Sequence, residues 1–194
     1  IEKFVALGGS IDSYGPIGPA WLRNMLGERF ADFFNSPRGV SLSGATLSDE
    51  EGAWLSQFRH LIGLSMEGCT LSDRAVAAIG VHRELTGLVL RRSTFNNETL
   101  HESLMSLEKL ELVEFSNTSF DDAGFECFGH MPNLKNIYLR GSRVRGPGLV
   151  HLRGLQQLEN VCLTWAPAGD EGLANLVTCP KLRLFEAGTR VRAE

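Results

Sequence analysis

One short pattern of apolar and polar positions returns along the chain at a nearly constant interval. Each copy has two apolar residues with a variable residue between them, as Ile137 and Leu139 have around Tyr138. Alternating residues of a β-strand point to opposite faces of its sheet, so each copy predicts a short strand with one buried face. The second apolar residue recurs after 24 or 25 residues, at Leu42, Met66, Leu90, Phe115, Leu139 and Leu163.

A period in the twenties with apolar residues at fixed offsets is typical of leucine-rich repeats. One unit cannot bury its apolar face alone, so neighbouring units must stack into a solenoid. The sequence therefore predicts an α/β leucine-rich repeat solenoid with a parallel concave sheet over residues 40–194. It contains about six full units and a partial seventh that begins at Leu182, where the register of LRLFEAGTRV is ambiguous.

The second half of each unit predicts a tight turn and then a short convex helix. A small residue stands three positions after each apolar anchor, where a hydroxyl can satisfy the backbone groups of the turn. These small residues are Ala45, Cys69, Ser93, Thr118, Ser142 and Ala166. Ser48 and Glu51 then form a capping-box pattern, and Asp73, Asp122 and Asp170 stand near later helix starts. We expect the extra residue of the 25-residue unit to lie in its helix.

Residues 1–39 break the period and predict an N-terminal cap. The segment 18–34, GPAWLRNMLGERFADFF, places its apolar residues on one helical stripe that would cover the first repeat. The SIDS stretch at 10–13 predicts a short strand, and IEKFVALGG resembles the end of a helix stopped by two glycines. The stretch 37–39 is the natural join between the cap and the repeats.

The turn-and-helix pattern resembles that of bacterial leucine-rich repeat proteins abundant in planctomycetes. Ser48-Asp49 and Ser72-Asp73 match the family pattern, whereas RGPGL at 145–149 lacks its acid. The leader before the repeats is also similar to the non-repeat segment of that group, so the resemblance covers nearly the whole chain. It implies the fold, no catalytic residues and no agreed ligand. It also implies a membrane anchor upstream of residue 1, which fits a chain that begins with Ile rather than Met.

Composition and charge exclude several classes of function. The net charge of −4 and the pI near 5.8 give no electrostatic reason to expect nucleic acid. The chain contains no run of 18 apolar residues, so we expect no membrane insertion by this segment. The five histidines never pair at helical spacing, and the glycines lack the strand–GxGxxG–helix context. We therefore expect neither a metal nor a cofactor.

The four cysteines favour buried or inert thiols over a redox or catalytic role. They show no CxxC spacing, so we expect four free thiols, with Cys69 and Cys179 buried. Cys127, His151 and Asn175 occupy one slot in three consecutive units, and together they suggest a thiol hydrolase. However, neighbouring convex helices lie about 10 Å apart, and a nucleophile needs its base within about 3 Å. The slot is also expected to face outward, so the sequence predicts no enzyme.

The concave face is the better candidate for a binding site. We expect two columns of exposed residues there, each with one residue per strand. The first lies just before the apolar anchors and runs from Ser41 to Cys162, and the second lies just after them and contains Ser116. The first two units carry small residues there, whereas the later units place large side chains within a patch about 15–20 Å across. This candidate binding patch consists of Arg91, Arg92, Glu114, Tyr138, Arg140 and Trp165. The alternative is an ordinary sheet surface on which neighbours such as Glu67 and Arg91 pair.

Two functions remain open from the sequence. The first is a non-catalytic interaction module that presents the concave sheet to a protein or peptide. The second is a structural or assembly unit of a cell-surface or membrane-anchored protein, stacking end to end. The C-terminal repeat has no segment like 1–39 to cover it, so we expect either self-association through this end or further repeats.

Overall fold

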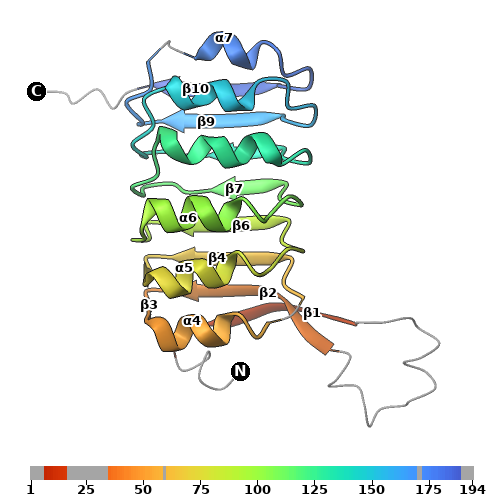
Figure 1. Ribbon diagram of the computed structural model, residues 1–194, viewed down its shortest axis with the longest axis vertical. Helices are drawn as coiled ribbons and strands as arrows, with labels where there is room; N and C mark the ends of the chain where they lie inside the picture. Colours follow the sequence, from red (N-terminus) through yellow and green to blue (C-terminus); the bar gives the residue numbers. More distant parts are fainter. Residues whose placement is uncertain (1–6, 17–34, 59, 170–171, 189–194) are drawn as a thin grey trace, which may run out of the picture.

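The computed structural model describes residues 7–16, 35–58, 60–169 and 172–188. Its repeats stack along one axis, with the strands in one layer and the helices in another (Figure 1). The expected helical stripe at 18–34 lies outside the described residues, and so does most of the helix end expected at 1–9.

The strand layer is one eight-stranded sheet with the order β1-β2-β4-β6-β7-β8-β9-β10. Strands β2 to β10 pair in parallel, and β1 pairs antiparallel to β2 at the N-terminal edge. The strands are β1 (Ser10–Pro16), β2 (Asn35–Ser43), β4 (Gly63–Glu67), β6 (Gly87–Arg91), β7 (Leu112–Glu114), β8 (Asn136–Tyr138), β9 (Asn160–Thr164) and β10 (Leu184–Gly188). The predicted parallel solenoid is confirmed, and so is the short strand predicted at 10–13.

A second, two-stranded sheet joins the turns of the first units. It pairs β3 (Thr46–Leu47) with β5 (Thr70–Leu71) in parallel. Along the chain, β3 follows β2 and β5 follows β4. Strand β2 runs without a break through the expected junction at residues 39 and 40. The division of the chain into a cap and a repeat array stays a prediction.

The second layer contains one short helix per unit, as predicted. The helices are α4 (Asp49–Leu55), α5 (Asp73–Ile79), α6 (Asn97–Leu104), η2 (Asp122–His130), η3 (Pro147–Leu152) and α7 (Leu173–Leu176). Two of them, η2 and η3, are 3-10 helices. Helix α6 has eight residues where α5 has seven, so the helix takes up the extra residue of the longer unit. Within the described part of the chain, every helix is too short or too polar to cross a lipid bilayer.

The core lies between the two layers and follows the predicted apolar anchors. Leu42, Met66, Leu90, Phe115, Leu139 and Leu163 are all 2% exposed or less. Phe120 packs among Phe115, Phe125 and Phe128, with ring centroids 5.0–5.9 Å apart. A Cβ atom on Gly124 would lie 2.4 Å from the Phe120 ring, so this cluster leaves no room for a larger residue there.

The helix caps combine expected and unexpected contacts. Ser48 and Glu51 form the predicted capping box of α4. The caps of α5 and η2 are Ser72 and Asp121, one residue before the aspartates noted in the sequence. Asp122 instead reaches the next unit, where its carboxylate accepts hydrogen bonds from three backbone N–H groups. The donors are Arg145 at 2.7 Å and Gly146 and Gly148 at 2.9 Å. This contact replaces the acid that RGPGL lacks.

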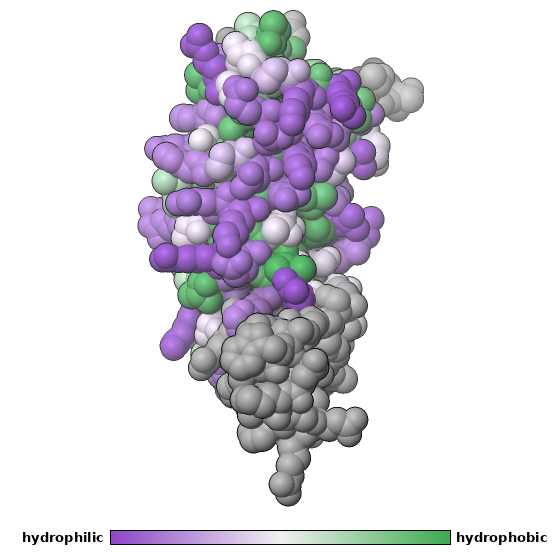
Figure 2. All heavy atoms as spheres, turned by 90° about the vertical axis from the view of Figure 1, so that its right-hand side faces the viewer, coloured by the Kyte–Doolittle hydropathy of each residue, from purple (hydrophilic) through white to green (hydrophobic). Residues whose placement is uncertain are grey.

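The side on which helices end and strands begin is largely hydrophilic (Figure 2). Ion pairs there join consecutive units, with Lys109 2.7 Å from Glu84 and Lys135 2.7 Å from Glu111. The last unit keeps the same register as the others, because Phe185 of β10 lies opposite Val161 and Ala187 lies opposite Leu163. The ambiguous register of the seventh unit is thereby settled.

Candidate functional site

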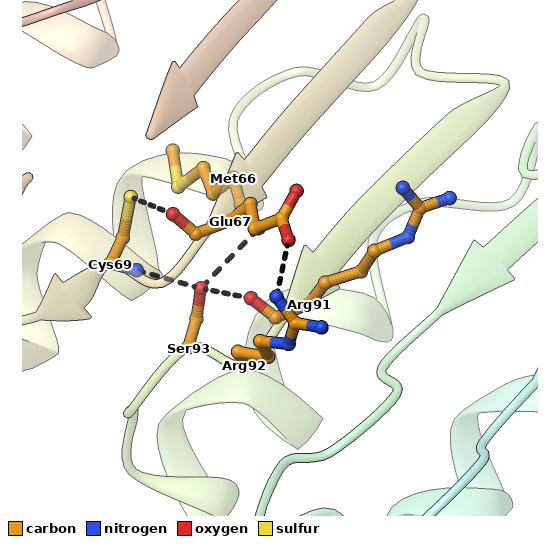
Figure 3. A network of polar contacts seen from close by, with 6 residues as sticks. All are labelled: Met66, Glu67, Cys69, Arg91, Arg92 and Ser93. Atoms are coloured by element: carbon orange, nitrogen blue, oxygen red, sulfur yellow. Dashed lines mark hydrogen bonds and ion pairs between the residues drawn. The ribbon is translucent and has the colours of Figure 1, made fainter. Parts of the chain in front are cut away.

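The candidate binding patch begins where the strands end, beside the small residues that stand three positions after each apolar anchor. We call these small residues the ladder. All six predicted ladder residues are buried, from 1% exposure at Cys69 to 8% at Thr118. The Ser93 hydroxyl accepts a 3.1 Å hydrogen bond from the Cys69 N–H group and lies 3.3 Å from the Met66 carbonyl oxygen (Figure 3). The prediction that hydroxyls satisfy the turning backbone is confirmed at Ser93 and Thr118, whereas the Ser142 hydroxyl has no partner among the described residues.

The residue just before each ladder position has a left-handed backbone. The column consists of Gly44, Gly68, Arg92, Asn117, Gly141 and Trp165, with φ between 51° and 66°. We call it the left-handed column. Each member donates its N–H group to a carbonyl of the following unit, at 2.6–2.9 Å, so the repeat ladder itself holds this conformation.

Three members of the left-handed column are not glycine. In a residue other than glycine, a positive φ brings the Cβ atom close to the backbone, which costs on the order of 1–2 kcal/mol. Asparagine tolerates this conformation best. Arg92 and Trp165 have no such tolerance. Trp165 is nevertheless 55% exposed, so core packing does not account for its place in the column. Strained residues of this kind cluster at functional sites.

Two arginines of the patch are held by carboxylates of neighbouring strands. Arg92 Nη1 lies 3.1 Å from Glu67 Oε1, as Figure 3 shows, and the Arg91 side chain points away from this pair. Arg91 Nη2 instead contacts Glu114 Oε2 at 2.7 Å, and this hydrogen bond raises the pKa of Arg91 above its ordinary value. The predicted Glu67–Arg91 pair is therefore wrong, because Arg91 reaches forward to the next strand and Glu67 is taken by the residue in the turn.

The third arginine lies at the centre of a second cluster. The Arg140 guanidinium lies 5.7 Å from the centre of the Tyr138 ring, within the range of a cation–π interaction. Its Nε–H group donates to Cys162 Sγ at 3.1 Å, and Glu186 Oε2 lies 3.1 Å from the same sulfur. Arg140 Nη2 is also 3.9 Å from Glu186. Together with Glu67 and Glu186, which contact the patch, the two clusters contain three arginines and three carboxylates and have no net charge.

Two residues expected on the concave face are buried. Cys162 is 0% exposed and Ser116 is 5% exposed. Cys162 contacts Arg140 and Glu186, whose long side chains lie across it. The Ser116 hydroxyl donates to Glu114 at 3.2 Å, on the strand beside Arg91. The columns alternate as predicted, but the larger side chains of the patch shield the smaller ones between them.

Glu186 is a member of the patch that sequence reasoning missed. It lies opposite Cys162 in the sheet register and extends the column of Glu114 and Tyr138 by two strands. The signal was present in the sequence, because Glu186 follows Cys162 by the same 24 residues that separate Cys162 from Tyr138. The ambiguous register of the last unit concealed it.

The described residues offer no support for a catalytic thiol. Cys127 is fully buried, contrary to the expected outward-facing slot, and its Sγ donates to the Gly124 carbonyl at 2.8 Å. Burial raises the pKa of Cys127 to about 12, the opposite of an activated nucleophile. Asn175 Nδ2 donates to the Gly172 carbonyl in its own turn. All four cysteines are free and buried, as predicted for Cys69 and Cys179. Among the described residues no three His, Cys, Asp or Glu side chains converge on a possible metal position.

Comparison with known proteins adds little to this picture. No family model matches the chain, and no curated protein matches it. Among solved structures, an internalin C2 from Listeria monocytogenes is similar over 79% of this chain and 81% of its own, with 14% identity and a TM-score of 0.48. Likeness at this level transfers no function. The fold assignment depends on the sheet and repeat geometry of the chain itself, and the planctomycete resemblance stays a prediction.

Proposed function

We propose that this chain is a non-catalytic interaction module that presents its concave sheet to a protein or peptide. The binding surface consists of Arg91, Arg92, Glu114, Tyr138, Arg140 and Trp165. The observation that carries the proposal is the left-handed column, in which Arg92 and Trp165 are exposed at positions whose backbone favours glycine. Backbone strain at exposed residues is typical of functional sites, which supports a contact with a partner in addition to contacts within the chain such as the Arg92–Glu67 ion pair.

The contacts inside the patch support this role. Arginine, tyrosine and tryptophan dominate the energetics of protein interfaces. Ion pairs with Glu114 and Glu186 hold Arg91 and Arg140 in defined positions, although their side chains remain 48% and 45% exposed. Side chains that are already ordered lose less entropy on binding. The patch is therefore preorganised to receive a partner.

The test begins with a cross-linked pull-down from the source organism to identify the partner. Binding of the purified partner is then measured for Tyr138→Ala, Arg140→Ala and Trp165→Ala. We expect each change to weaken binding by about 1–4 kcal/mol and to alter folding by about 0.5 kcal/mol or less. Ser41→Ala and Ser65→Ala are matched controls on the same face of the early units. Full binding by all three patch variants would refute the proposal.

A second candidate function, assembly through the C-terminal end, is favoured by a separate observation. An open apolar groove there is lined by Leu173, Leu176, Val177, Cys179, Leu182 and Phe185. Val177 is 86% exposed and Leu184 of the outermost strand is 42% exposed. We propose a second copy of this chain as its occupant under this alternative. Light scattering over a concentration series tests it: Val177→Asp should abolish any dimer, and a wild-type monomer at all concentrations would rule the alternative out.

A further inference from the structure

One stretch of the chain has a charge opposite to that of the whole. Residues 127–158 contain five Lys or Arg side chains and no Asp or Glu, although the net charge of the chain is −4. The five cations are Lys135, Arg140, Arg143, Arg145 and Arg153. A local excess of one sign attracts ligands of the other sign and accelerates their association.

Two of these arginines lie on the turn that follows β8, beside the left-handed column. The Arg143 N–H group donates to the Phe120 carbonyl at 2.8 Å, and the Arg145 N–H group donates to Asp122 at 2.7 Å. Both backbones are thereby fixed to the preceding unit. Both residues are exposed, so their guanidinium groups extend into solvent from a rigid base.

Neither guanidinium has a carboxylate within ion-pair distance among the described residues, unlike those of Arg91, Arg92 and Arg140. Asp121 and Asp122 of the preceding unit are engaged with other groups. Asp122 accepts three backbone hydrogen bonds, and Asp121 accepts one from the Ala123 N–H group and one from Asn97. Both carboxylates accept hydrogen bonds from these groups, and neither forms an ion pair with the Arg143 or Arg145 side chain among the described residues.

We propose that Arg143, Arg145 and Trp165 form a recognition rim for an acidic peptide segment of the partner protein. This inference rests on the proposed function and names the chemistry of its ligand. Guanidinium groups bind carboxylates with two parallel hydrogen bonds, and the exposed indole of Trp165 offers a flat surface for an apolar side chain. Gly141 lies between Asn117 and Trp165 in the left-handed column, and the Asn117 amide oxygen fills the space that a Gly141 side chain would take.

A nucleic acid fits the same surface poorly. A phosphate backbone brings a continuous line of negative charge. The concave face beside the rim carries Glu67, Glu114 and Glu186 between its arginines. Because these carboxylates already pair with its arginines, this face offers no net attraction to a long phosphate chain, whereas a short acidic segment needs only the rim.

The test uses a fluorescein-labelled synthetic peptide of alternating Glu and Leu, with a Lys–Leu peptide of equal length beside it. Fluorescence anisotropy is measured at low and at physiological salt. We expect the acidic peptide to bind, the basic peptide not to bind, and the Arg143→Gln/Arg145→Gln variant to weaken binding on the order of tenfold. Added salt should weaken binding to the wild-type chain more than to this variant.

A matched control removes the same charge elsewhere. Arg74→Gln/Arg83→Gln changes two exposed arginines on and just after α5, and should leave peptide binding within about twofold of wild type. Equal losses in the two double variants would show a general charge effect and overturn the rim. Tighter binding of a single-stranded oligonucleotide than of the acidic peptide would also overturn it.

The outcome is separable from that of the concave patch. Tyr138→Ala should reduce binding of the native partner and leave the acidic peptide nearly unaffected, because the ring is not part of the rim. If the rim variant loses the peptide while Tyr138→Ala keeps full binding of the partner, the rim stands and the patch fails. If the peptide binds both double variants like wild type while the patch variants lose the partner, the rim fails and the patch stands.

Discussion

At the scale of single residues, the left-handed column shows most clearly how the sequence departs from the needs of the fold. Gly44, Gly68 and Gly141 satisfy the positive φ of this turn without strain. Arg92 and Trp165 adopt the same φ with a Cβ atom. Neither side chain is buried, so we expect relief of backbone strain to exceed the loss of surface contacts such as the Arg92–Glu67 ion pair when either residue is changed to glycine.

The first prediction follows from this strain. Arg92→Gly and Trp165→Gly should each raise the free energy of unfolding by about 1 kcal/mol, because relief of strain exceeds the entropy cost of glycine. Urea denaturation measures the change. Asn117→Gly is the matched control and should gain less, because asparagine tolerates this conformation. Loss of stability in both the Arg92 and the Trp165 variant would contradict the strain argument.

A second prediction concerns the buried imidazole of His82. Burial lowers its pKa, against an opposing effect of hydrogen bonds with the Leu55 and Phe58 backbone, and its Nε2 atom has no partner among the described residues. Below about pH 6.5 the unfolded chain therefore binds a proton that the folded chain does not, and folding becomes less favourable as the pH falls. The loss should reach roughly 1 kcal/mol between pH 7.5 and 5.5.

Urea denaturation of His82→Leu at both pH values isolates this contribution. The variant should lose less stability on acidification than the wild type, whatever its stability at pH 7.5. His130→Leu, at an exposed histidine, should keep the wild-type pH dependence. Parallel pH profiles for wild type and His82→Leu would show that the imidazole plays no such part.

At the scale of the elements, each turn is completed by the unit before or after it. Helix η3 has Gly146 at its N-cap and no side-chain cap of its own. The Asp122 carboxylate of the preceding unit takes that role through three backbone N–H groups. The sequence shows only that RGPGL lacks an acid, because a cap supplied across units depends on the stacking geometry.

The third prediction tests this cap. Asp122→Ala leaves three N–H groups without their partner and should cost about 2–3 kcal/mol of folding free energy. Asp121→Ala removes one backbone hydrogen bond at the N-cap of η2 and a long one from the Asn97 side chain, and should cost about 1 kcal/mol. Hydrogen exchange should show the amides of Arg145, Gly146 and Gly148 losing protection in the first variant. Equal losses of folding free energy in the two variants would show that the cap between units stabilises the fold no more than an ordinary N-cap does.

The regular parts of the fold could be predicted from the sequence, and the contacts across the concave face could not. The apolar period places every anchor in the core, and the extra residue of the third interval, between Leu90 and Phe115, lies in α6 as expected. The period cannot show how long side chains lie over their neighbours. Cys162 is therefore buried beneath Arg140 and Glu186, although its column points away from the core, and Arg91 pairs with Glu114 rather than Glu67. The left-handed column was within reach, because three of its members are glycines at one register.

At the scale of the whole molecule, the two ends of the array differ in character. The early units present small side chains on the concave face, and the later units carry the arginines, the exposed tryptophan and the acid-free stretch. Stability is shared by all the units through one continuous core. Recognition is therefore expected from the later units, whereas the early units support the array.

This division predicts a contrast within one unit. Leu139→Ala should cost about 2–5 kcal/mol of folding free energy by opening a cavity, because Leu139 is fully buried. Tyr138→Ala, one residue away, should alter folding little and weaken binding of the partner. Chemical denaturation and calorimetric titration measure the two effects. A large folding cost for Tyr138→Ala would mean that the ring supports the fold rather than recognition.

We infer from the left-handed column that Trp165 is kept for binding and not for folding. The most direct test is to measure the stability and the partner affinity of Trp165→Gly side by side, with the partner identified by pull-down. We expect a chain that is about 1 kcal/mol more stable and binds its partner roughly ten times more weakly or worse. A variant that is less stable and binds with wild-type affinity would contradict it.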